Sequence, residues 1–193
     1  PGITSYSVED TDGNDYEAIK IGNQVWMAEN LKVTHFRDGT PIDNVTDNNA
    51  WSNLTTSAYC FYNNNESMSG TYGYLYNWYA VNDDRNIAPD GWHVPTEAEW
   101  KELEIYLGLS QSEADNNGWR GTEAGGKLKE KGSSHWGNPN VGATNKSSFT
   151  ALPGGARSTI GIFTSLGSSA YFWSSTQNDG SSGWSRLLSS PYS

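Results

Sequence analysis

The supply of large apolar side chains is the feature that most limits what this chain can fold into. Hydrophobic residues make up 35% of its 193 residues, and the mean hydropathy is −0.70. Nine Trp, eleven Tyr and five Phe nevertheless give an aromatic share of 13%, and disordered chains are poor in aromatic residues. A chain of this length can bury roughly 70% of the surface that its unfolded form exposes. We therefore expect a polar, aromatic-rich globular domain with long loops.

Charge is unevenly distributed along the chain. Twelve basic residues stand against 22 acidic ones, for a net charge of −10. Residues 1–131 hold 21 of the acids and nine of the bases, whereas residues 132–193 hold one acid and three bases. An acidic chain without a basic cluster is a poor candidate for binding nucleic acid or an anionic membrane. No apolar run approaches the roughly 20 residues that a membrane-spanning helix needs, so we expect no transmembrane segment.

The final third has the composition of an adaptable binding surface. Residues 132–193 contain sixteen Ser, nine Gly and eight aromatic residues, a palette like that of antibody loops. A sandwich of short strands joined by Ser- and Gly-rich turns would have the same composition, and both interpretations can hold at once. The sequence has no fixed-period repeat and no Pro-rich linker, which favours a single domain over residues 1–193.

The single cysteine excludes several kinds of site. With Cys60 alone there is no disulfide framework within the chain, no multi-cysteine metal site and no redox pair. Cys60 lies between Tyr59 and Phe61, so we expect it to be buried and unreactive. The three histidines are too scattered for the ligand spacing of a zinc site: they are His35, His93 and His135.

One acidic stretch has the composition of a calcium loop. Residues 10–15 (DTDGND) gather the carboxylate and amide oxygens that hard cations prefer. An EF-hand needs glycine at the sixth position and glutamate at the twelfth, whereas here Gly13 is fourth and Ile21 is twelfth. The preferred interpretation is a hairpin turn, with calcium binding as the alternative.

No motif for catalysis is evident. The Ser-rich end lacks a G-x-S-x-G turn, and the glycine pairs at 125–126 and 154–155 lack the Lys and Ser/Thr of a phosphate loop. Four glutamates share one predicted helix and are interpreted as dipole partners and a solvated face: Glu97, Glu99, Glu102 and Glu104. We expect no enzymatic activity and no cofactor.

The clearest element is a helix over residues 96–107. Thr96 and Glu99 have the spacing of a capping box, and Gly108 supplies a stop. Apolar residues then recur at spacings of three and four along one face: Trp100, Leu103, Tyr106 and Leu107. The other predicted elements are a hairpin of 3–8 and 16–21, a strand at 24–27, a surface loop over 43–70 crossed by an apolar patch at 58–62, a buried segment at 72–81, a helix at 124–131, and short strands at 149–152, 161–163 and 171–174. Together they predict an α+β fold with short strands and long loops.

Several long motifs resemble those of one protein family. They are residues 16–31 (YEAIKIGNQVWMAENL), 72–81 (YGYLYNWYAV), 88–100 (APDGWHVPTEAEW), 125–130 (GGKLKE), 149–157 (FTALPGGAR) and 173–176 (WSST). Their content and order resemble the Fibrobacter succinogenes major paralogous domain, from about residue 8 to the end of the chain. That family is similar to the group that includes formylglycine-generating enzymes and C-type lectin-like domains.

The resemblance implies a C-type lectin-like fold with short twisted antiparallel strands. It also implies a secreted or surface-anchored, lipoprotein-like protein of Bacteroidota or Fibrobacter-like bacteria. It does not imply the enzyme, because formylglycine-generating enzymes use a late cysteine pair and no cysteine follows Cys60 here. Family members also continue into a closing strand that contains a cysteine, whereas this chain stops at Ser193. We therefore expect either a truncated end or a sheet edge completed by a neighbouring chain.

The first functional hypothesis is a non-catalytic binding or display module whose late loops contact a protein or a glycan. Aromatic rings with adaptable polar neighbours suit either ligand, and the candidate residues are Tyr171, Trp173, Gln177, Asn178, Trp184 and Arg186. For Trp173 and Trp184 a place in the core is an equal alternative. The second hypothesis is a structural subunit of an extracellular filament or surface assembly, with neighbouring copies of the chain as partners. Formylglycine-generating activity and calcium-dependent sugar binding receive the least weight.

Overall fold

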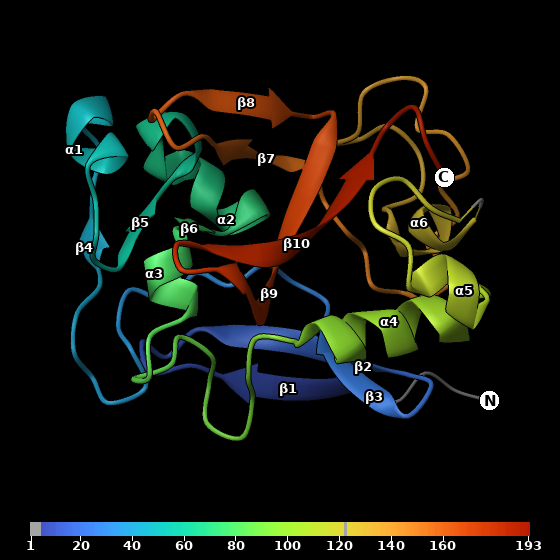
Figure 1. Cartoon of the computed structure of the whole chain (residues 1–193), viewed down its shortest axis with the longest axis horizontal. Coiled ribbons are helices and arrows are strands. Elements are labelled where there is room, and N and C mark those ends of the chain that lie inside the picture. The colour runs from blue at the N-terminus through green and yellow to red at the C-terminus, as the bar shows by residue number, and fades with distance from the viewer. Residues whose placement is uncertain (1–4, 122) are drawn as a thin grey trace.

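Strands account for most of the regular structure, and the helices are short (Figure 1). The computed structural model describes residues 5–121 and 123–193. The strands are β1 (Ser5–Glu9), β2 (Asp15–Ile21), β3 (Gln24–Met27), β4 (Asp43–Asn44), β5 (Ala58–Cys60), β6 (Leu75–Tyr76), β7 (Gly154–Arg157), β8 (Phe163–Leu166), β9 (Ser169–Asp179) and β10 (Ser182–Ser189). The helices are α1 (Asn48–Ser52), η1 (Tyr62–Asn64), η2 (Glu66–Met68), α2 (Ser69–Tyr72), α3 (Trp78–Val81), α4 (Glu97–Tyr106), α5 (Gln111–Ala114) and α6 (Ala124–Leu128). The predicted α+β class is confirmed.

The first sheet is the antiparallel meander β1-β2-β3. The hairpin and the strand at 24–27 are confirmed, although residues 3 and 4 lie outside the described part of the chain. The turn is built around the Asp10 carboxylate, which accepts the backbone N–H groups of Asp12 and Asn14 at 2.9 Å and the Tyr16 hydroxyl at 2.6 Å. Gly13 supplies the positive φ of +79° that such a turn favours. The hairpin interpretation of this acidic stretch is thus confirmed.

Helix α4 begins as its sequence predicts. The Thr96 hydroxyl accepts the Glu99 N–H at 3.2 Å, and the Glu99 carboxylate accepts the Thr96 N–H at 2.7 Å. Trp100 and Leu103 face the core as expected, but Tyr106 does not. Tyr106 is 64% exposed, and its ring lies over Gly22. A Cβ on Gly22 would come within 2.8 Å of the Tyr106 Cδ2, so the glycine makes room for that ring.

Residues 43–70 are not the single surface loop that their polar composition predicts. They form β4, α1, β5, η1, η2 and α2 in close succession. The reason is tertiary packing, since Trp51, Ala58 and Cys60 form a buried cluster of their own. Burial of Cys60 is confirmed and raises the pKa of its thiol. The predicted buried segment at 72–81 becomes β6 followed by α3, with Trp78 buried.

The later elements differ from their predictions in extent. Helix α6 ends at Leu128, three residues before the expected boundary. Residues 149–152 form no named strand, and only a bridge between Lys129 and Ala151 pairs there. Strand β8 begins at Phe163, and the predicted strand at 171–174 is part of the longer β9.

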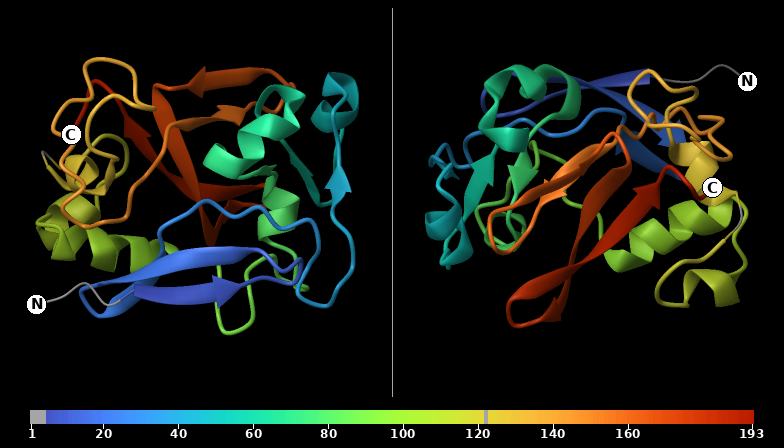
Figure 2. Two further views of the ribbon diagram at one scale, coloured as in Figure 1. Left: turned by 180° about the vertical axis from the view of Figure 1, so that it is seen from behind. Right: turned by 90° about the horizontal axis from the view of Figure 1, so that it is seen from above.

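The second large sheet has the order β10-β9-β7-β8, with β10 at one edge. β9 and β10 form a long antiparallel hairpin that projects from the molecule (Figure 2). β7 pairs with β9 in parallel at Gly155 and Ala170. The third sheet, of order β4-β5-β6, is smaller.

The largest apolar cluster lies between the first sheet, α4, α6 and β9. It includes Ile19, Ile21, Trp26, Trp100, Leu103, Leu107, Leu109, Ala114, Ala124, Leu128, Phe149 and Ala151. A second cluster, built around Phe36 and Trp78, joins residues between Val33 and Ile87 with Trp173 packed against it. Among the described residues, no helix is both long and apolar enough to span a bilayer. Aromatic side chains are prominent in both clusters, as the composition predicts.

Candidate functional site

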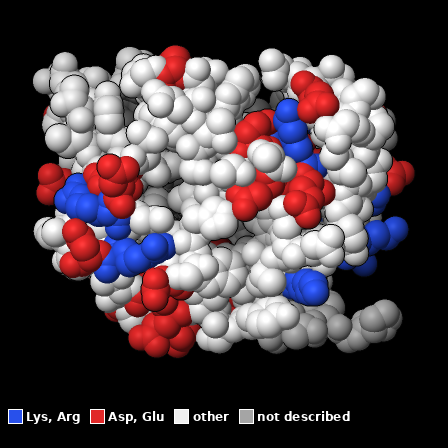
Figure 3. Space-filling view, turned by 60° about the horizontal axis from the view of Figure 1, so that its bottom comes forward, with Lys and Arg blue, Asp and Glu red and all other residues white. Residues whose placement is uncertain are grey.

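On one face of the molecule, most basic side chains lie close to acidic ones. On the face shown in Figure 3, Lys and Arg side chains lie next to Asp and Glu side chains, with uncharged surface between the groups. Among the described residues, no group of three or more His, Cys, Asp or Glu side chains could hold a metal ion. The candidate site is instead a pocket lined by ion pairs and aromatic rings.

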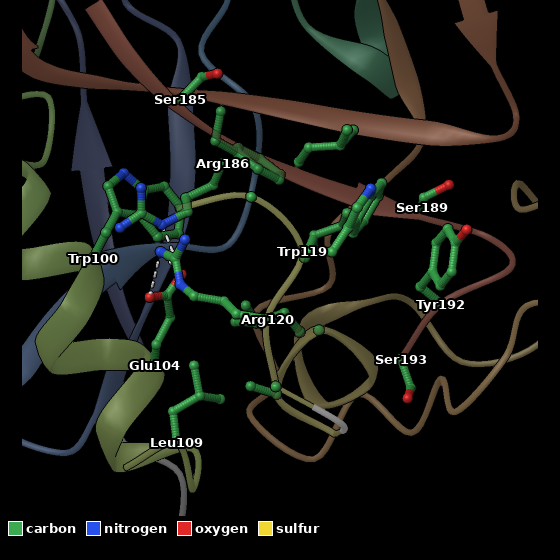
Figure 4. A pocket seen from close by; sticks show the side chains of 18 of the residues that line it. Trp100, Glu104, Leu109, Trp119, Arg120, Ser185, Arg186, Ser189, Tyr192 and Ser193 are labelled. Carbon is green, nitrogen blue, oxygen red and sulfur yellow. Dashed lines mark hydrogen bonds and ion pairs between the residues drawn. The ribbon is translucent and has the colours of Figure 1, made fainter. Parts of the chain in front are cut away.

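This pocket, of about 640 Å³, lies between α4, residues 117–121, α6 and β10 (Figure 4). Its volume falls within the 300–1,000 Å³ that is usual for small-molecule sites. One wall consists of charged side chains from α4, β10 and the segment 117–121, and the other presents two aromatic rings. We call it the β10 pocket.

The charged wall is a network of four side chains. Arg186 donates from Nη1 and Nη2 to the two carboxylate oxygens of Glu97, at 2.7 and 2.8 Å, and from Nε to Glu104 at 2.6 Å. Arg120 donates from Nη2 to the same Glu104 carboxylate, at 3.0 and 3.2 Å. Two negative and two positive charges are thereby paired. Bidentate guanidinium–carboxylate contacts of this kind fix geometry as well as charge.

Helical periodicity explains why these glutamates are turned inward. Glu97 and Glu104 stand three residues before and four residues after Trp100, so all three lie on one face of α4. Glu104 is buried, which corrects the expectation that all four glutamates of this helix form a solvated face. Burial acts to lower the pKa of Arg186, but the hydrogen bonds to Glu97 and the charges of both glutamates outweigh it and raise that pKa. Arg186 is therefore held more firmly in its charged form.

The aromatic wall is a pair of exposed rings. The Trp119 and Tyr192 ring centroids are 4.5 Å apart with an interplanar angle of 37°, and the two residues are 59% and 53% exposed. Figure 4 shows the two rings side by side, across the pocket from Trp100 and Glu104. Gly118 and Gly121, with φ of +82° and +73°, form the turn that presents Trp119. A Cβ on Gly121 would come within 2.8 Å of the Leu109 Cδ1.

A buried lysine lies beneath the aromatic wall. Lys129 is 1% exposed, and its ammonium donates to the backbone carbonyls of Val141 at 2.8 Å, Ser189 at 3.1 Å and Tyr192. Burial lowers the pKa of Lys129 to about 8. Because its acceptors come from two segments distant in sequence, Lys129 joins the end of β10 to residue 141 and fixes the backbone that presents Tyr192.

The structure brings together two of the six sequence-predicted site residues. Trp184 and Arg186 both line the β10 pocket, Trp184 half-buried and Arg186 buried in the charged wall. Arg186 is therefore held by Glu97 and Glu104 and is not an adaptable side chain at a loop surface.

The other four lie elsewhere. Tyr171 is exposed, but it alternates with Phe172 along β9 and so points to the other face of the strand. Trp173 is half-buried against Trp78, with its ring N–H donated to the Tyr76 carbonyl at 2.9 Å, as expected of a core residue. Gln177 and Asn178 are exposed near the β9–β10 turn, outside the residues that line the β10 pocket. A larger cavity of about 1,480 Å³ borders Tyr171 and Trp173 and is lined by many core side chains.

Sequence reasoning missed the residues that define the pocket. Trp119 and Arg120 lie in the stretch NNGWRG, where an aromatic residue between two glycines signals a ring presented by a turn. The position of Glu104 on the apolar stripe of its helix signals a buried carboxylate. For Tyr192 and Lys129 the sequence offers no signal, since their roles depend on contacts with distant segments.

A family model described as the Fibrobacter succinogenes major domain matches residues 19–192. The match spans nearly the whole chain and includes α4, β10 and both walls of the pocket. The comparison with curated proteins found no match, and the comparison with solved structures found none either.

Proposed function

The chain belongs to the Fibrobacter succinogenes major domain family, and from this premise we propose that it is a non-catalytic binding module whose ligand occupies the β10 pocket. The proposal includes a bacterial cell-surface or extracellular location and a C-type lectin-like arrangement of the fold, both implied by the motifs that the chain shares with that family. It includes no cofactor.

One observation supports the proposal above the others, the exposure of Trp119 and Tyr192. Two large rings that pack against each other at a tilt, both more than half exposed, leave apolar surface in water, which folding alone does not require. Tyr and Trp rings supply rigid, amphipathic contact area at a low cost in conformational entropy. A ligand that covers the pair would remove that surface from water.

The remainder of the pocket is suited to holding a ligand in one orientation. The charged wall is fixed by its own ion pairs, and Lys129 fixes the backbone beneath Tyr192. A prearranged site loses little conformational freedom on binding, which favours affinity. Neither carboxylate of the charged wall is free to act as an acid or a base on a ligand, because each of its oxygens already accepts a guanidinium N–H. Binding is therefore better supported than acid–base chemistry.

The test is a binding screen read through the aromatic wall. The purified chain is probed with a printed array of neutral and acidic oligosaccharides and with a displayed peptide library. Trp119→Ala and Tyr192→Ala are expected to remove the signal of any true ligand. Tyr106→Ala, which deletes an equally exposed ring outside the pocket, is the matched control and should bind normally. Binding that survives both pocket variants, or no binding by any probe, would contradict the proposal.

A second candidate function is a structural subunit of an extracellular assembly. It is favoured by the position of β10, an eight-residue strand at an edge of its sheet. Unpaired N–H and C=O groups on an edge strand can pair with a strand of another chain. Sedimentation velocity over a hundredfold range of concentration tests this function. A single species with the mass of one chain at every concentration would argue against it.

A further inference from the structure

Resting on the proposed function, we propose that the ligand of the β10 pocket is an extended peptide segment of a partner protein, which binds as an added strand along the open edge of β10. The backbone N–H and C=O groups of the segment pair with those of Ser185 and Leu187. The support comes from three observations: the run of β10 residues along the pocket, the direction in which their backbone groups point, and the place where the edge is already covered.

The β10 pocket follows the edge of the strand. The six consecutive residues 184–189 all line it. Because successive side chains point to opposite faces of a sheet, a pocket on one face alone would be lined chiefly by every second residue. Within the described residues, β10 pairs with β9 and with no other strand. The lined stretch of this open edge is about 20 Å long, enough for a segment of roughly six extended residues.

The backbone groups at this edge alternate in direction. In an antiparallel pair, every second residue bonds to the partner strand, and the residues between them point their N–H and C=O groups away from it. The Ser190 N–H donates to the Ser168 carbonyl at 2.9 Å, which fixes the alternation at the end of β10. From residue 185 to residue 189 the register with β9 is unbroken. The backbone groups of Ser185 and Leu187 therefore point to the open edge.

Two further contacts agree with this alternation. The Trp173 carbonyl, opposite Ser185 in the register, accepts the Trp100 ring N–H at 3.2 Å, as expected of a residue pair that does not bond across the two strands. The Ser189 carbonyl accepts from the Lys129 ammonium at 3.1 Å, so it too points away from β9. Both contacts place the odd-numbered residues of β10 with their backbone groups toward the edge.

The edge is covered only at its C-terminal end. There Lys129 binds the Ser189 carbonyl, and the Val141 N–H donates to the Ser190 carbonyl at 2.8 Å. Ser185 and Leu187, in contrast, are exposed. A row of unpaired N–H and C=O groups on an exposed edge strand is a template for another strand. The free stretch of the edge is thus the part that runs along the pocket.

The walls of the pocket suit the side chains of such a segment. Trp119 and Tyr192 expose apolar ring surface, and Trp184 and Leu188 line the pocket from one face of β10. A strand beside β10 would turn every second side chain toward this surface, so we expect apolar residues at alternate positions of the segment. A saccharide could cover the rings, but it has no regular row of donors and acceptors to match the strand edge.

The proposal is tested with the whole chain and a displayed library of random octapeptides. The tightest peptide is synthesised with one N-methyl group at each position in turn, which removes one backbone N–H donor at a time. Methylation at alternate positions should weaken binding about tenfold, and methylation between them should change the Kd less than about twofold, because only every second N–H faces β10. The selected peptides should also have apolar residues at alternate positions.

A substitution tests the same contact from the side of the protein. Leu187→Pro removes an N–H that points to the open edge and leaves the bonds to β9 in place, and an edge strand tolerates proline at such a position. Peptide binding should weaken about tenfold. Leu187→Thr keeps the N–H, so this matched control should weaken binding less. A thermal melt checks the fold of each variant. If Leu187→Pro does not fold, the N-methyl series on the native chain still decides.

The possible outcomes separate this inference from the proposed function. Peptide binding without a period of two in the N-methyl series, or equal effects of the two Leu187 variants, would overturn strand addition but leave a binding module in place. Binding only of oligosaccharides through Trp119 would do the same. Self-association that Leu187→Pro abolishes would overturn the foreign segment in favour of a second copy of the chain. If no peptide and no oligosaccharide binds, the proposed function itself fails.

Discussion

Two aromatic pairs in this molecule have almost the same geometry and opposite surroundings. The Trp26 and Trp100 ring centroids are 4.7 Å apart with an interplanar angle of 46°, and the residues are 8% and 2% exposed. The Trp119 and Tyr192 rings are 4.5 Å apart at 37°, but more than half of each residue is exposed. The first pair lies in the largest apolar cluster, whereas the second faces solvent at the β10 pocket.

The comparison shows that pair geometry does not identify the role of a pair. Ring–ring attraction adds only about 0.5–1.5 kcal/mol beyond the burial of area, so the surroundings decide what each pair contributes. The core pair removes large rings from water and stabilises the fold. The exposed pair buries less of its apolar surface in the fold and therefore contributes less to stability.

The largest effect is expected from breaking the core pair. Trp100→Ala removes a ring that contacts Trp26, Phe149 and Phe172 and donates its N–H to the Trp173 carbonyl. The free energy of unfolding should fall by about 4 kcal/mol, because a large buried ring leaves a cavity. Urea denaturation followed by circular dichroism measures it. A loss below about 1 kcal/mol would show that the two pairs do not differ in their contribution to stability.

The next effect separates the two walls of the pocket. Glu104→Gln removes the negative charge that the buried Arg186 and the half-buried Arg120 share. The free energy of unfolding should fall by about 3 kcal/mol, since breaking a buried pair leaves an uncompensated charge. Glu102→Gln, on the same helix but exposed, is the matched control and should change stability by less than about 0.5 kcal/mol. Equal effects of the two substitutions would show that the charged wall contributes no more to the free energy of unfolding than an exposed glutamate does.

A pH-dependent effect is expected from the lysine beneath the exposed pair. Burial lowers the pKa of Lys129 in the fold to about 8 from its ordinary value of 10.5. Between these two values the unfolded chain binds more protons than the folded chain, so this group makes stability rise with pH across that interval and leaves it level below about 8. The rise should amount to about 3 kcal/mol over that interval.

The pH profile of the urea midpoint measures this rise. Lys129→Met should remove it, whereas Lys20→Met, an exposed control, should keep it. Parallel profiles of the native chain and Lys129→Met would contradict the assignment.

The smallest effect on stability is expected from the exposed pair itself. Trp119→Ala should lower the free energy of unfolding by less than about 1 kcal/mol, because the ring is 59% exposed in the fold. The same urea experiment measures it beside Trp100→Ala. A loss comparable to that of Trp100→Ala would mean that the exposed pair stabilises the fold, which would remove the main support for a binding role.

Local signals are sufficient to predict the elements that local contacts build. The Asp10 turn and the Thr96–Glu99 cap are made within a few residues of sequence, and the structure confirms both. The surroundings of a side chain are set by segments distant in sequence, which a single sequence does not reveal. Trp100 and Trp119 are the same residue type, yet one meets Phe149 and the other meets Tyr192 at the surface.

The dependence on segments distant in sequence also explains the predictions that were wrong. The polar composition of residues 43–70 predicts a loop, and it gives no sign that Trp51 packs with Cys60. The six candidate site residues fall on both faces of β9 and β10, because their chemistry alone takes no account of strand alternation. Arg186 and Trp184 suit a binding site by their chemistry, and the network that buries Arg186 comes from a glutamate 82 residues earlier.

The largest apolar cluster also has a consequence for how the chain folds. It joins the sheet at residues 15–27 to α4 and then to residues 149–151, so its contacts close long loops before they gain stability. Topologies dominated by such distant contacts fold on a scale of milliseconds to seconds rather than microseconds. During synthesis, the apolar face of the first sheet must wait until Phe149 and Ala151 have emerged. The Asp10 turn is made by local contacts, but a lone hairpin is only marginally stable, so the first sheet becomes stable only when the core assembles around it.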